Sequence, residues 1–246
     1  MNFLSLFKRN LIYKFKKKIS IDRDSFPKKD LDQLFFYYGS DKANTFRKNG
    51  TKGHGYSKYY YSQLKDLKSN KLRILEIGSY AGASAAAFAK YFENSKIYCF
   101  DINISKFKYQ SKNIEVFGAD IKNKSQILKI LEEIFSKNNF QQFDIIIDDG
   151  SHKLSDILFG LNLFFKYLKN NGYYVIEDYK FPNKLKNYND VNDILVDELL
   201  VKFKNKQFFT SNFFSSSDQK YFFSSIKEIL TFKGNLEISD ICFIKK

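Results

Sequence analysis

The sequence predicts an α/β fold in which helices cover both faces of a mostly parallel sheet. From Leu72 onward, short apolar runs alternate with helical patterns, which is the sequence rhythm of such a sheet. The chain then ends in two strand-like runs, about 224–232 and 237–244, joined by Gly234-Asn235. This spacing predicts a hairpin, which gives the sheet an antiparallel edge.

The predicted strands are apolar runs bounded by glycine or polar residues, and the predicted helices fill the intervals between them. Strands are expected at 72–77, 96–101, 113–117, 143–148 and 172–177. Helices are expected at 82–93, 104–111, 123–137 and 153–169, with Asn171-Gly172 ending the last of these, and a further helix at 190–204.

The length of 246 residues and the hydrophobic content of 43% suffice for one full core. We expect residues 71–246 to form the main domain. Residues 1–70 are expected to form a helical extension apart from the sheet, and a role for it as a lid stays open. The oligomeric state also stays open, a homo-oligomer included.

The formal charge of +14 raises nucleic acid as a partner, but the basic residues are spread along the chain without an RNA-binding signature. We therefore expect no specific nucleic acid. The first thirty residues hold nine Lys or Arg against three Asp, a net of +6, interleaved with apolar residues. Two interpretations stay open for this segment: weak contact with an anionic membrane surface, or a basic helix packed on the domain by Phe3, Leu4, Phe7 and Leu11.

The N-terminal apolar stretch is interrupted by Lys8 and Arg9 and lacks a small-residue cleavage site. It therefore predicts neither a signal peptide nor a transmembrane helix, and we expect a cytoplasmic protein. Cys99 and Cys242 lie in strand-like apolar runs without metal-ligand spacing, so both are predicted to be small buried thiols.

A cofactor site is predicted where the first two strands end. The first strand runs through Glu76 to Gly78, and the second ends in Asp101. Ligands bind at the carboxyl ends of parallel strands, where a glycine admits close approach and an acid holds ribose hydroxyls. Tyr80 stands where a pyrophosphate-binding loop needs its middle glycine, and Glu76 suits a cationic ligand. The alternative is a glycine turn that serves only the tight connection.

Asp120 follows the third strand and is a candidate contact for an adenine amino group. Its alternative role is to cap the helix that follows.

A reaction site is predicted where the fourth and fifth strands end. The fourth strand leads into Asp148-Asp149-Gly150-Ser151-His152, and the fifth ends in Glu177-Asp178. Four carboxylates so close together repel one another unless a cation compensates them, and an all-oxygen set favours magnesium, manganese or calcium. Neighbouring strand residues point to opposite faces, so Glu177 and Asp178 can share a metal only if the strand ends between them. The alternative has these acids capping a helix or forming ion pairs.

The pattern E-x-G-x-x-x-G, followed by a strand ending in Asp and by G-A-D, resembles the class I S-adenosylmethionine-dependent methyltransferases. The resemblance covers residues 72–246 and implies a Rossmann-like sheet of seven strands, the last two being the hairpin. It implies that Asp101 binds the ribose and that Asp120 lies at the adenine. The cofactor residues expected on this basis are Glu76, Gly78, Ser79, Tyr80, Ser84, Asp101, Asp120 and Asp148.

Within these methyltransferases, DDGSH followed by a strand ending in IED resembles the macrocin- and mycinamicin-type sugar O-methyltransferases and the group named for cephalosporin hydroxylation. This resemblance implies magnesium ligands at Asp149, Glu177 and Asp178, and His152 as the general base. An upstream segment, Gly39–Lys42 and Lys52–Tyr56, is similar to pieces that precede the fold in this group, with its order changed by an insertion.

Together these features predict a magnesium-dependent O-methyltransferase that uses S-adenosylmethionine on a hydroxyl of a sugar or glycosylated small molecule. One alternative is a nicotinamide-dependent oxidoreductase, which Tyr80 and the terminal hairpin disfavour. The other is a non-catalytic subunit of a glycan pathway with a purely structural acidic cluster.

Overall fold

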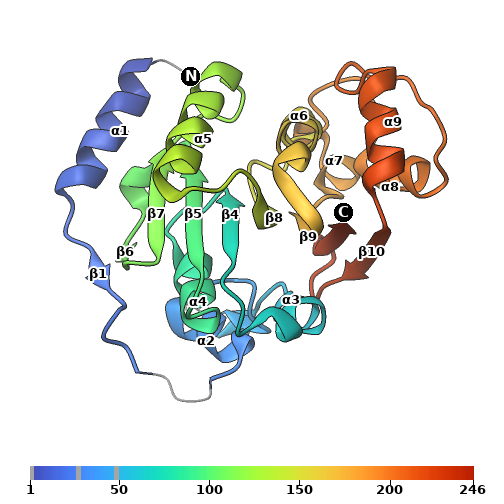
Figure 1. Cartoon of the computed structure of the whole chain (residues 1–246). Coiled ribbons are helices and arrows are strands. Elements are labelled where there is room, and N and C mark those ends of the chain that lie inside the picture. Colours follow the sequence, from blue (N-terminus) through green and yellow to red (C-terminus); the bar gives the residue numbers. More distant parts are fainter. Residues whose placement is uncertain (1–2, 26–28, 47–49) are drawn as a thin grey trace. The chain divides into compact units, whose positions relative to one another are not determined.

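A computed structural model describes residues 3–25, 29–46 and 50–246 of the chain (Figure 1). Seven strands form one sheet in the order β10-β11-β9-β8-β4-β5-β7, and helices flank it, which confirms the predicted fold class. The chain divides into two compact units, residues 1–140 and 141–246. The predicted boundary after residue 70 does not coincide with this division and stays a prediction.

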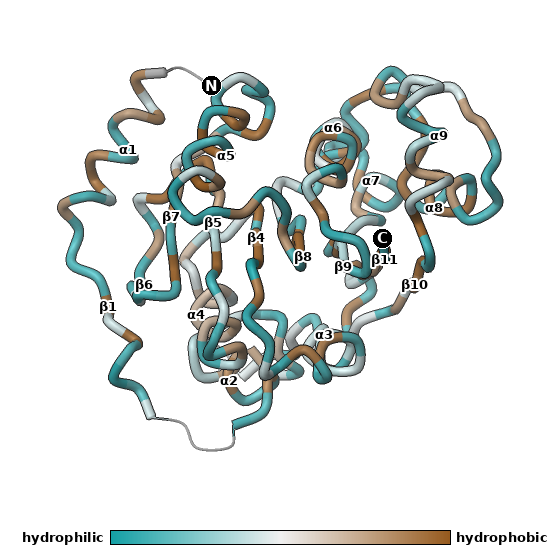
Figure 2. Tube along the Cα trace, in the orientation of Figure 1, coloured by the Kyte–Doolittle hydropathy of each residue, from teal (hydrophilic) through white to brown (hydrophobic). Residues whose placement is uncertain are grey.

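The first unit contributes three parallel strands, β4 (Arg73–Ile77), β5 (Lys96–Asp101) and β7 (Ile114–Gly118). The apolar residues of β4 and β5 are buried because both faces of the sheet are covered there, whereas most of the edge strand β7 is half-buried. The brown stretches of the trace mark the apolar residues of these strands (Figure 2). The helices α4 (Ala83–Tyr91) and α5 (Lys124–Asn138) follow β4 and β7.

The described residues before β4 include three helices, α1 (Phe3–Phe15), α2 (Leu31–Tyr38) and α3 (Ser57–Leu64), and a 3-10 turn, η1 (Lys65–Leu67). The segment also adds short strands: β1 (Ile19–Ser20) pairs with β6 (Tyr109–Gln110), and β2 (Thr45–Phe46) pairs with β3 (Thr51–Lys52). Aromatic rings join α2 and α3 to α4, since the ring of Phe88 lies 5.2 Å from the rings of both Phe35 and Tyr60.

The predicted helix at 104–111 is wrong. The structure has a 3-10 turn, η2 (Ile104–Lys106), followed by β6. Ile104 and Phe107 are buried, which produced the helical spacing. The backbone of residues 109–110 instead pairs with β1, a partner about ninety positions away that local periodicity does not reveal.

The helix α1 packs through other residues than those expected. Leu4, Phe7 and Leu11 are exposed, whereas Leu6 is buried and Tyr13 meets the ring of Phe107 edge-on at 6.3 Å. The side chain of Phe3 lies outside the described part of the chain. The packed-helix interpretation therefore named the wrong face, because both faces of this helix carry apolar residues.

The second unit contains two parallel strands, β8 (Phe143–Asp148) and β9 (Leu168–Glu177), and an antiparallel pair, β11 (Asp240–Lys245) and β10 (Glu228–Lys233). Strand β11 also runs antiparallel to β9, which confirms the predicted hairpin. The helices and turns of this unit are α6 (Leu154–Phe164), η3 (Phe165–Tyr167), α7 (Phe181–Lys184), η4 (Lys186–Tyr188), α8 (Val196–Lys204) and α9 (Ser216–Ser225).

Two expectations for this unit are wrong. Asn171-Gly172 does not end a helix, because β9 already begins at Leu168 and its register with β8 shifts between Phe143 and Ile145. Asn171 takes a φ of 65° within this irregular stretch. The helix α9 was not expected either, although Ser215 and Asp218 form the reciprocal pair of a capping box at its start.

Cys99 and Cys242 are buried free thiols, as predicted. Burial raises the pKa of both thiols. Within the described ranges, none of the helices is both long enough and apolar enough to cross a bilayer.

Candidate functional site

Two strands of the second unit end in acids. Asp148 is the last residue of β8 and Asp149 follows it, while Glu177 is the last residue of β9 and Asp178 follows it. Since β8 and β9 are parallel neighbours, their carboxyl ends meet at the same edge. All four acids therefore lie at the carboxyl ends of neighbouring strands, and β9 ends between Glu177 and Asp178.

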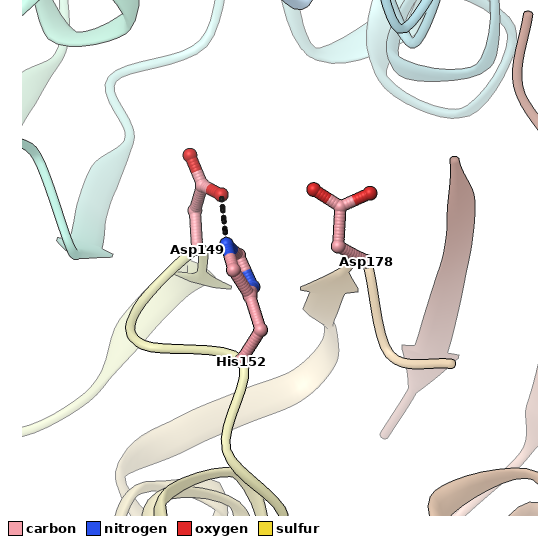
Figure 3. Close-up of side chains that lie close together, drawn as sticks. All are labelled: Asp149, His152 and Asp178. Atoms are coloured by element: carbon pink, nitrogen blue, oxygen red, sulfur yellow. Dashed lines mark ion pairs between the residues drawn. The ribbon is translucent and has the colours of Figure 1, made fainter. Parts of the chain in front are cut away.

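Asp149, His152 and Asp178 each present a ligand atom, and these atoms lie within 4.8 Å of one another (Figure 3). The Nε2 atom of His152 lies 3.8 Å from Oδ1 of Asp149, which is longer than a hydrogen bond. Asp178 is buried, whereas Asp149 and His152 are partly open to solvent. Such a group matches the size of a cation site that keeps one side accessible.

The backbone at two of these residues is strained. His152 has a φ of 57° and Asp178 a φ of 52°, in the left-handed region that side-chain-bearing residues seldom adopt. Conformations of this kind cost of order 1–3 kcal/mol and persist where the surrounding structure holds them in place. Here they turn the chain sharply after each strand and bring both side chains to the group.

Asp148, which directly precedes Asp149, is almost fully buried. Burial raises its pKa to about 7, and the charges of Asp149 and Asp156 act in the same direction. The backbone N–H of Gly150 and the hydroxyl of Tyr174 donate to its carboxylate at 3.3 and 3.4 Å and oppose the rise. This carboxyl is therefore the group near the site whose charge depends on its surroundings at neutral pH.

The donor set fits a hard divalent cation. Two carboxylates with an imidazole nearby suit magnesium or manganese better than zinc, which favours nitrogen and sulfur ligands. Glu177 is buried at the end of β9 and is not among the three ligand atoms that lie within 4.8 Å. Its predicted place in the ligand set stays a prediction.

The segment from β8 to α6 is held by residues that the sequence patterns did not single out. Ser151 donates its hydroxyl to Asp156, and Ser155 donates its hydroxyl and backbone N–H to Asp190 at 2.7 and 3.0 Å. The ring of Phe181 lies 4.8 Å from that of His152. The only sequence signal for these contacts was the density of Ser and Asp, since their partners lie up to 35 positions apart.

The capping alternative for Asp148 and Asp149 is not observed. The N-cap residue of α6 is Lys153, and its side chain makes no capping hydrogen bond. The two aspartates are therefore not explained by the helix that follows them.

The glycine turn after β4 lies in the first unit. Gly78 and Gly82 have φ values of 87° and 79°, and Tyr80 between them has a φ of 43°. The backbone N–H of Tyr80 donates to Oδ2 of Asp101 at 2.7 Å, and that of Asn103 donates to Oδ1 at 2.5 Å. Asp101 thus joins the end of β5 to the turn, and the exposed ring of Tyr80 lies at its edge.

Glu76 is fully buried on β4. The hydroxyl of Ser84, in the first turn of α4, donates to its Oε1 at 2.5 Å, and the hydroxyl of Ser79 donates to its backbone carbonyl at 3.3 Å. The three predicted cofactor residues Glu76, Ser79 and Ser84 are therefore linked around one turn.

Asp120 does not cap α5. The capping residue is Asn123, whose side chain accepts from the backbone N–H of Gln126, while Asp120 accepts from the backbone N–H of Lys122 at 3.1 Å. The capping alternative for Asp120 is wrong, and its predicted role at an adenine stays a prediction.

The upstream histidine, His54, lies in the first unit, 4.0 Å from Oδ2 of Asp41, with the ring of the buried Tyr56 at 5.2 Å. In the described part of the chain it does not belong to the group of metal-ligand types at Asp149.

A protein-family model described as "Methyltransferase domain" matches residues 75–179. Residues 75–179 are therefore similar to a methyltransferase domain. The match begins in β4 and ends just after Asp178, so the matched region includes both the glycine turn and the acidic group.

Curated relatives are 24–30% identical to this chain over 152–158 aligned residues. L-olivosyl-oleandolide 3-O-methyltransferase of Streptomyces antibioticus is 30% identical over 155 residues, which are 60% of this chain and 36% of that protein. Mycinamicin VI 2''-O-methyltransferase of Micromonospora griseorubida is 27% identical over 158 residues, 61% of this chain and 36% of that protein. The aligned part is thus about a third of the length of these relatives.

Among solved structures, the MycE methyltransferase of the mycinamycin biosynthetic pathway, in complex with Mg and SAH, has the same fold. The two chains superpose with a TM-score of 0.67 at 21% identity, over 89% of this chain and 55% of the other. The likeness extends beyond residues 75–179 and includes most of the chain.

Proposed function

We propose that this chain is an S-adenosylmethionine-dependent, divalent-metal-dependent O-methyltransferase that acts on a hydroxyl of a sugar or glycosylated small molecule. The observation that carries the proposal is the convergence of Asp149, His152 and Asp178 at the ends of two strands within a methyltransferase domain. The names of the curated relatives, which are O-methyltransferases of glycosylated natural products, support the choice of acceptor.

In this proposal, Asp149 and Asp178 hold the cation, with Glu177 as a third carboxylate ligand. A bound divalent cation supplies positive charge that lowers the pKa of a hydroxyl beside it. Hard cations prefer oxygen, so His152 is assigned to proton transfer and not to the ligand set. Its Nε2 faces Asp149 without a hydrogen bond of normal length, which leaves the nitrogen able to turn toward an acceptor hydroxyl.

At the methyl carbon the reaction would form one bond and break one, and a proton would leave the acceptor oxygen. The acceptor oxygen attacks the sulfonium methyl carbon, the carbon–sulfur bond breaks, and its electron pair stays on sulfur, giving S-adenosylhomocysteine. The hydroxyl proton passes to Nε2 of His152, which then releases it to water. General-base help of this kind typically contributes ~10²–10⁴-fold to the rate.

The first unit is proposed to hold the methyl donor at the turn between β4 and α4. Asp101 is assigned to the ribose hydroxyls, and its carboxylate is already oriented by the N–H groups of Tyr80 and Asn103. Glu76, buried below the turn, is assigned to the cationic part of the donor. Gly78 lets the backbone approach the ligand closely.

Thermal unfolding of the purified protein tests the proposal. S-adenosylhomocysteine at 100 times its dissociation constant is expected to add ~2.7 kcal/mol to the free energy of unfolding. At ~2–4 °C per kcal/mol this raises the Tm by roughly 5–10 °C, and magnesium is expected to add a further rise. NAD serves as the control and is expected to leave the Tm unchanged. Stabilisation by NAD but not by S-adenosylhomocysteine contradicts the proposal and revives the oxidoreductase alternative.

A further inference from the structure

The helix α1 carries two distinct faces. Its inner face is attached to the first unit: Leu6 is buried, Arg9 donates to the carbonyl of Ile102 at 3.0 Å, and Tyr13 packs on Phe107. Just beyond the helix, Lys16 donates to the carbonyl of Ser105 at 2.9 Å. These contacts hold the helix in one orientation on η2 and β7, and so decide which residues face outward (Figure 1).

The outer face is apolar and exposed. Leu4, Phe7, Leu11 and Phe15 are 69%, 58%, 46% and 78% exposed. Their spacing of three, four and four residues places them in a single stripe along the helix. Large apolar side chains scattered over a surface are ordinary, but four in one continuous row mark a surface that something covers. The alternation of brown and teal along α1 shows the two kinds of residue side by side (Figure 2).

Positive charge borders the stripe. Residues 3–21 contain six Lys or Arg and no Asp or Glu. Arg9 and Lys16 are used in contacts with the first unit, whereas Lys8, Lys14 and Lys17 are exposed. Successive residues of an α-helix are 100° apart around its axis. Lys8 and Lys14 therefore lie on opposite edges of the apolar row.

We propose that α1 docks this protein on the surface of an anionic phospholipid bilayer. A helix with an apolar row bordered by lysines lies in the plane of the interface, with the row among the acyl chains and the ammonium groups at the phosphates. At 13 residues the helix is ~20 Å long, which is too short to span a bilayer and long enough to lie on one. Charge complementarity selects anionic lipid as the occupant, because no acidic residue in the segment opposes it. This proposal does not depend on the proposed function.

Co-sedimentation of the full chain with vesicles tests the proposal. Binding is expected to vesicles of equal parts phosphatidylglycerol and phosphatidylcholine at about 0.1 M salt, and to weaken as salt rises. Pure phosphatidylcholine vesicles are expected to bind far less. The double variant F7S/F15S is expected to bind at least tenfold more weakly. The triple variant K8Q/K14Q/K17Q is expected to lose about fivefold per lysine.

Matched controls make the same kinds of substitution at exposed positions outside α1. F208S removes another exposed phenylalanine, and K124Q/K129Q/K220Q removes the same charge from exposed positions elsewhere. Both controls are expected to bind like the unaltered protein, and a far-UV spectrum confirms that the α1 variants are folded. Binding that is equal on neutral vesicles, or that F7S/F15S leaves unchanged, overturns the proposal. Light scattering that shows a dimer dissociated by F7S/F15S also overturns it, because the face then covers a second copy of this chain.

Discussion

Replacing Asp148 by Asn is expected to stabilise the metal-free protein, and to do so more strongly as the pH rises. Asp148 is buried, and its pKa rises from 3.8 to about 7 on folding. The folded protein therefore holds this proton more tightly than the unfolded chain. The stability that the proton contributes is present below the unfolded pKa and is lost as the pH rises through the folded one.

The magnitude follows from the size of the shift. About three units at ~1.36 kcal/mol each give a cost of about 4 kcal/mol once the carboxyl is ionised in the folded protein. Asn carries no charge at any pH and still accepts from the hydroxyl of Tyr174 or the N–H of Gly150. Between pH 5 and pH 8, linkage predicts that the difference in the free energy of unfolding between variant and parent grows by about 2–3 kcal/mol.

Thermal unfolding in EDTA at pH 5 and pH 8 measures this difference. For a chain of this size the Tm gap between D148N and the parent is expected to widen by roughly 5–10 °C. All other titrating groups are common to both proteins, so their contributions cancel in the gap. A Tm gap that is the same at both pH values would refute the reasoning, because Asp148 would then be ionised or protonated throughout the range.

The remaining predictions concern the metal group, the core and the glycine turn. D178N is expected to weaken magnesium binding at least tenfold in calorimetry. H152Q is expected to retain magnesium binding and to lose ~10²-fold or more in the rate of methyl transfer. If both variants lose magnesium binding equally, His152 is a metal ligand and the assignment is wrong. F222A removes a buried ring stacked between Phe165 and Phe203, with centroid distances of 4.5 and 4.7 Å. The free energy of unfolding in urea is expected to fall by about 3–5 kcal/mol. A fall below about 1 kcal/mol would show that the neighbouring rings fill the space. G82A puts a Cβ 2.5 Å from the ring of Phe107 at a φ of +79°, and G39A, with a φ of +80° and open space around it, is the control. G82A is expected to lower the Tm more than G39A. Equal losses would show that the contact with Phe107 costs nothing and that only the left-handed backbone, at ~1–2 kcal/mol, destabilises both variants.

Most of the sheet could be predicted from the sequence to within a few residues because its central strands β4, β5 and β8 are buried. β5 and β8 begin and end at the predicted positions, β4 begins one residue later than predicted, and β7 is shifted by one residue at both ends. Burial forces an uninterrupted apolar run, and such a run is a local signal. The signal failed where the partner is distant, as in the pairing of residues 109–110 with β1.

The candidate site could be predicted in part. The acids at the ends of β8 and β9 were found because parallel neighbours end at the same edge, which is a property of the fold class. The proximity of His152 to Asp178 was not visible in the sequence in the same way. It depends on positive φ angles at both residues. Neither position holds glycine, the residue type that would predict such an angle.

The sequence by itself determined the α/β class, the terminal hairpin and the residue types at the strand ends, since all of these follow from local patterns of apolar and polar residues. Only the tertiary structure decided which face of α1 is exposed and that burial raises the pKa of Asp148. The physical reason is the same in each case. A side chain's environment is set by contacts between residues far apart in the chain, and these contacts exist only once the chain has folded.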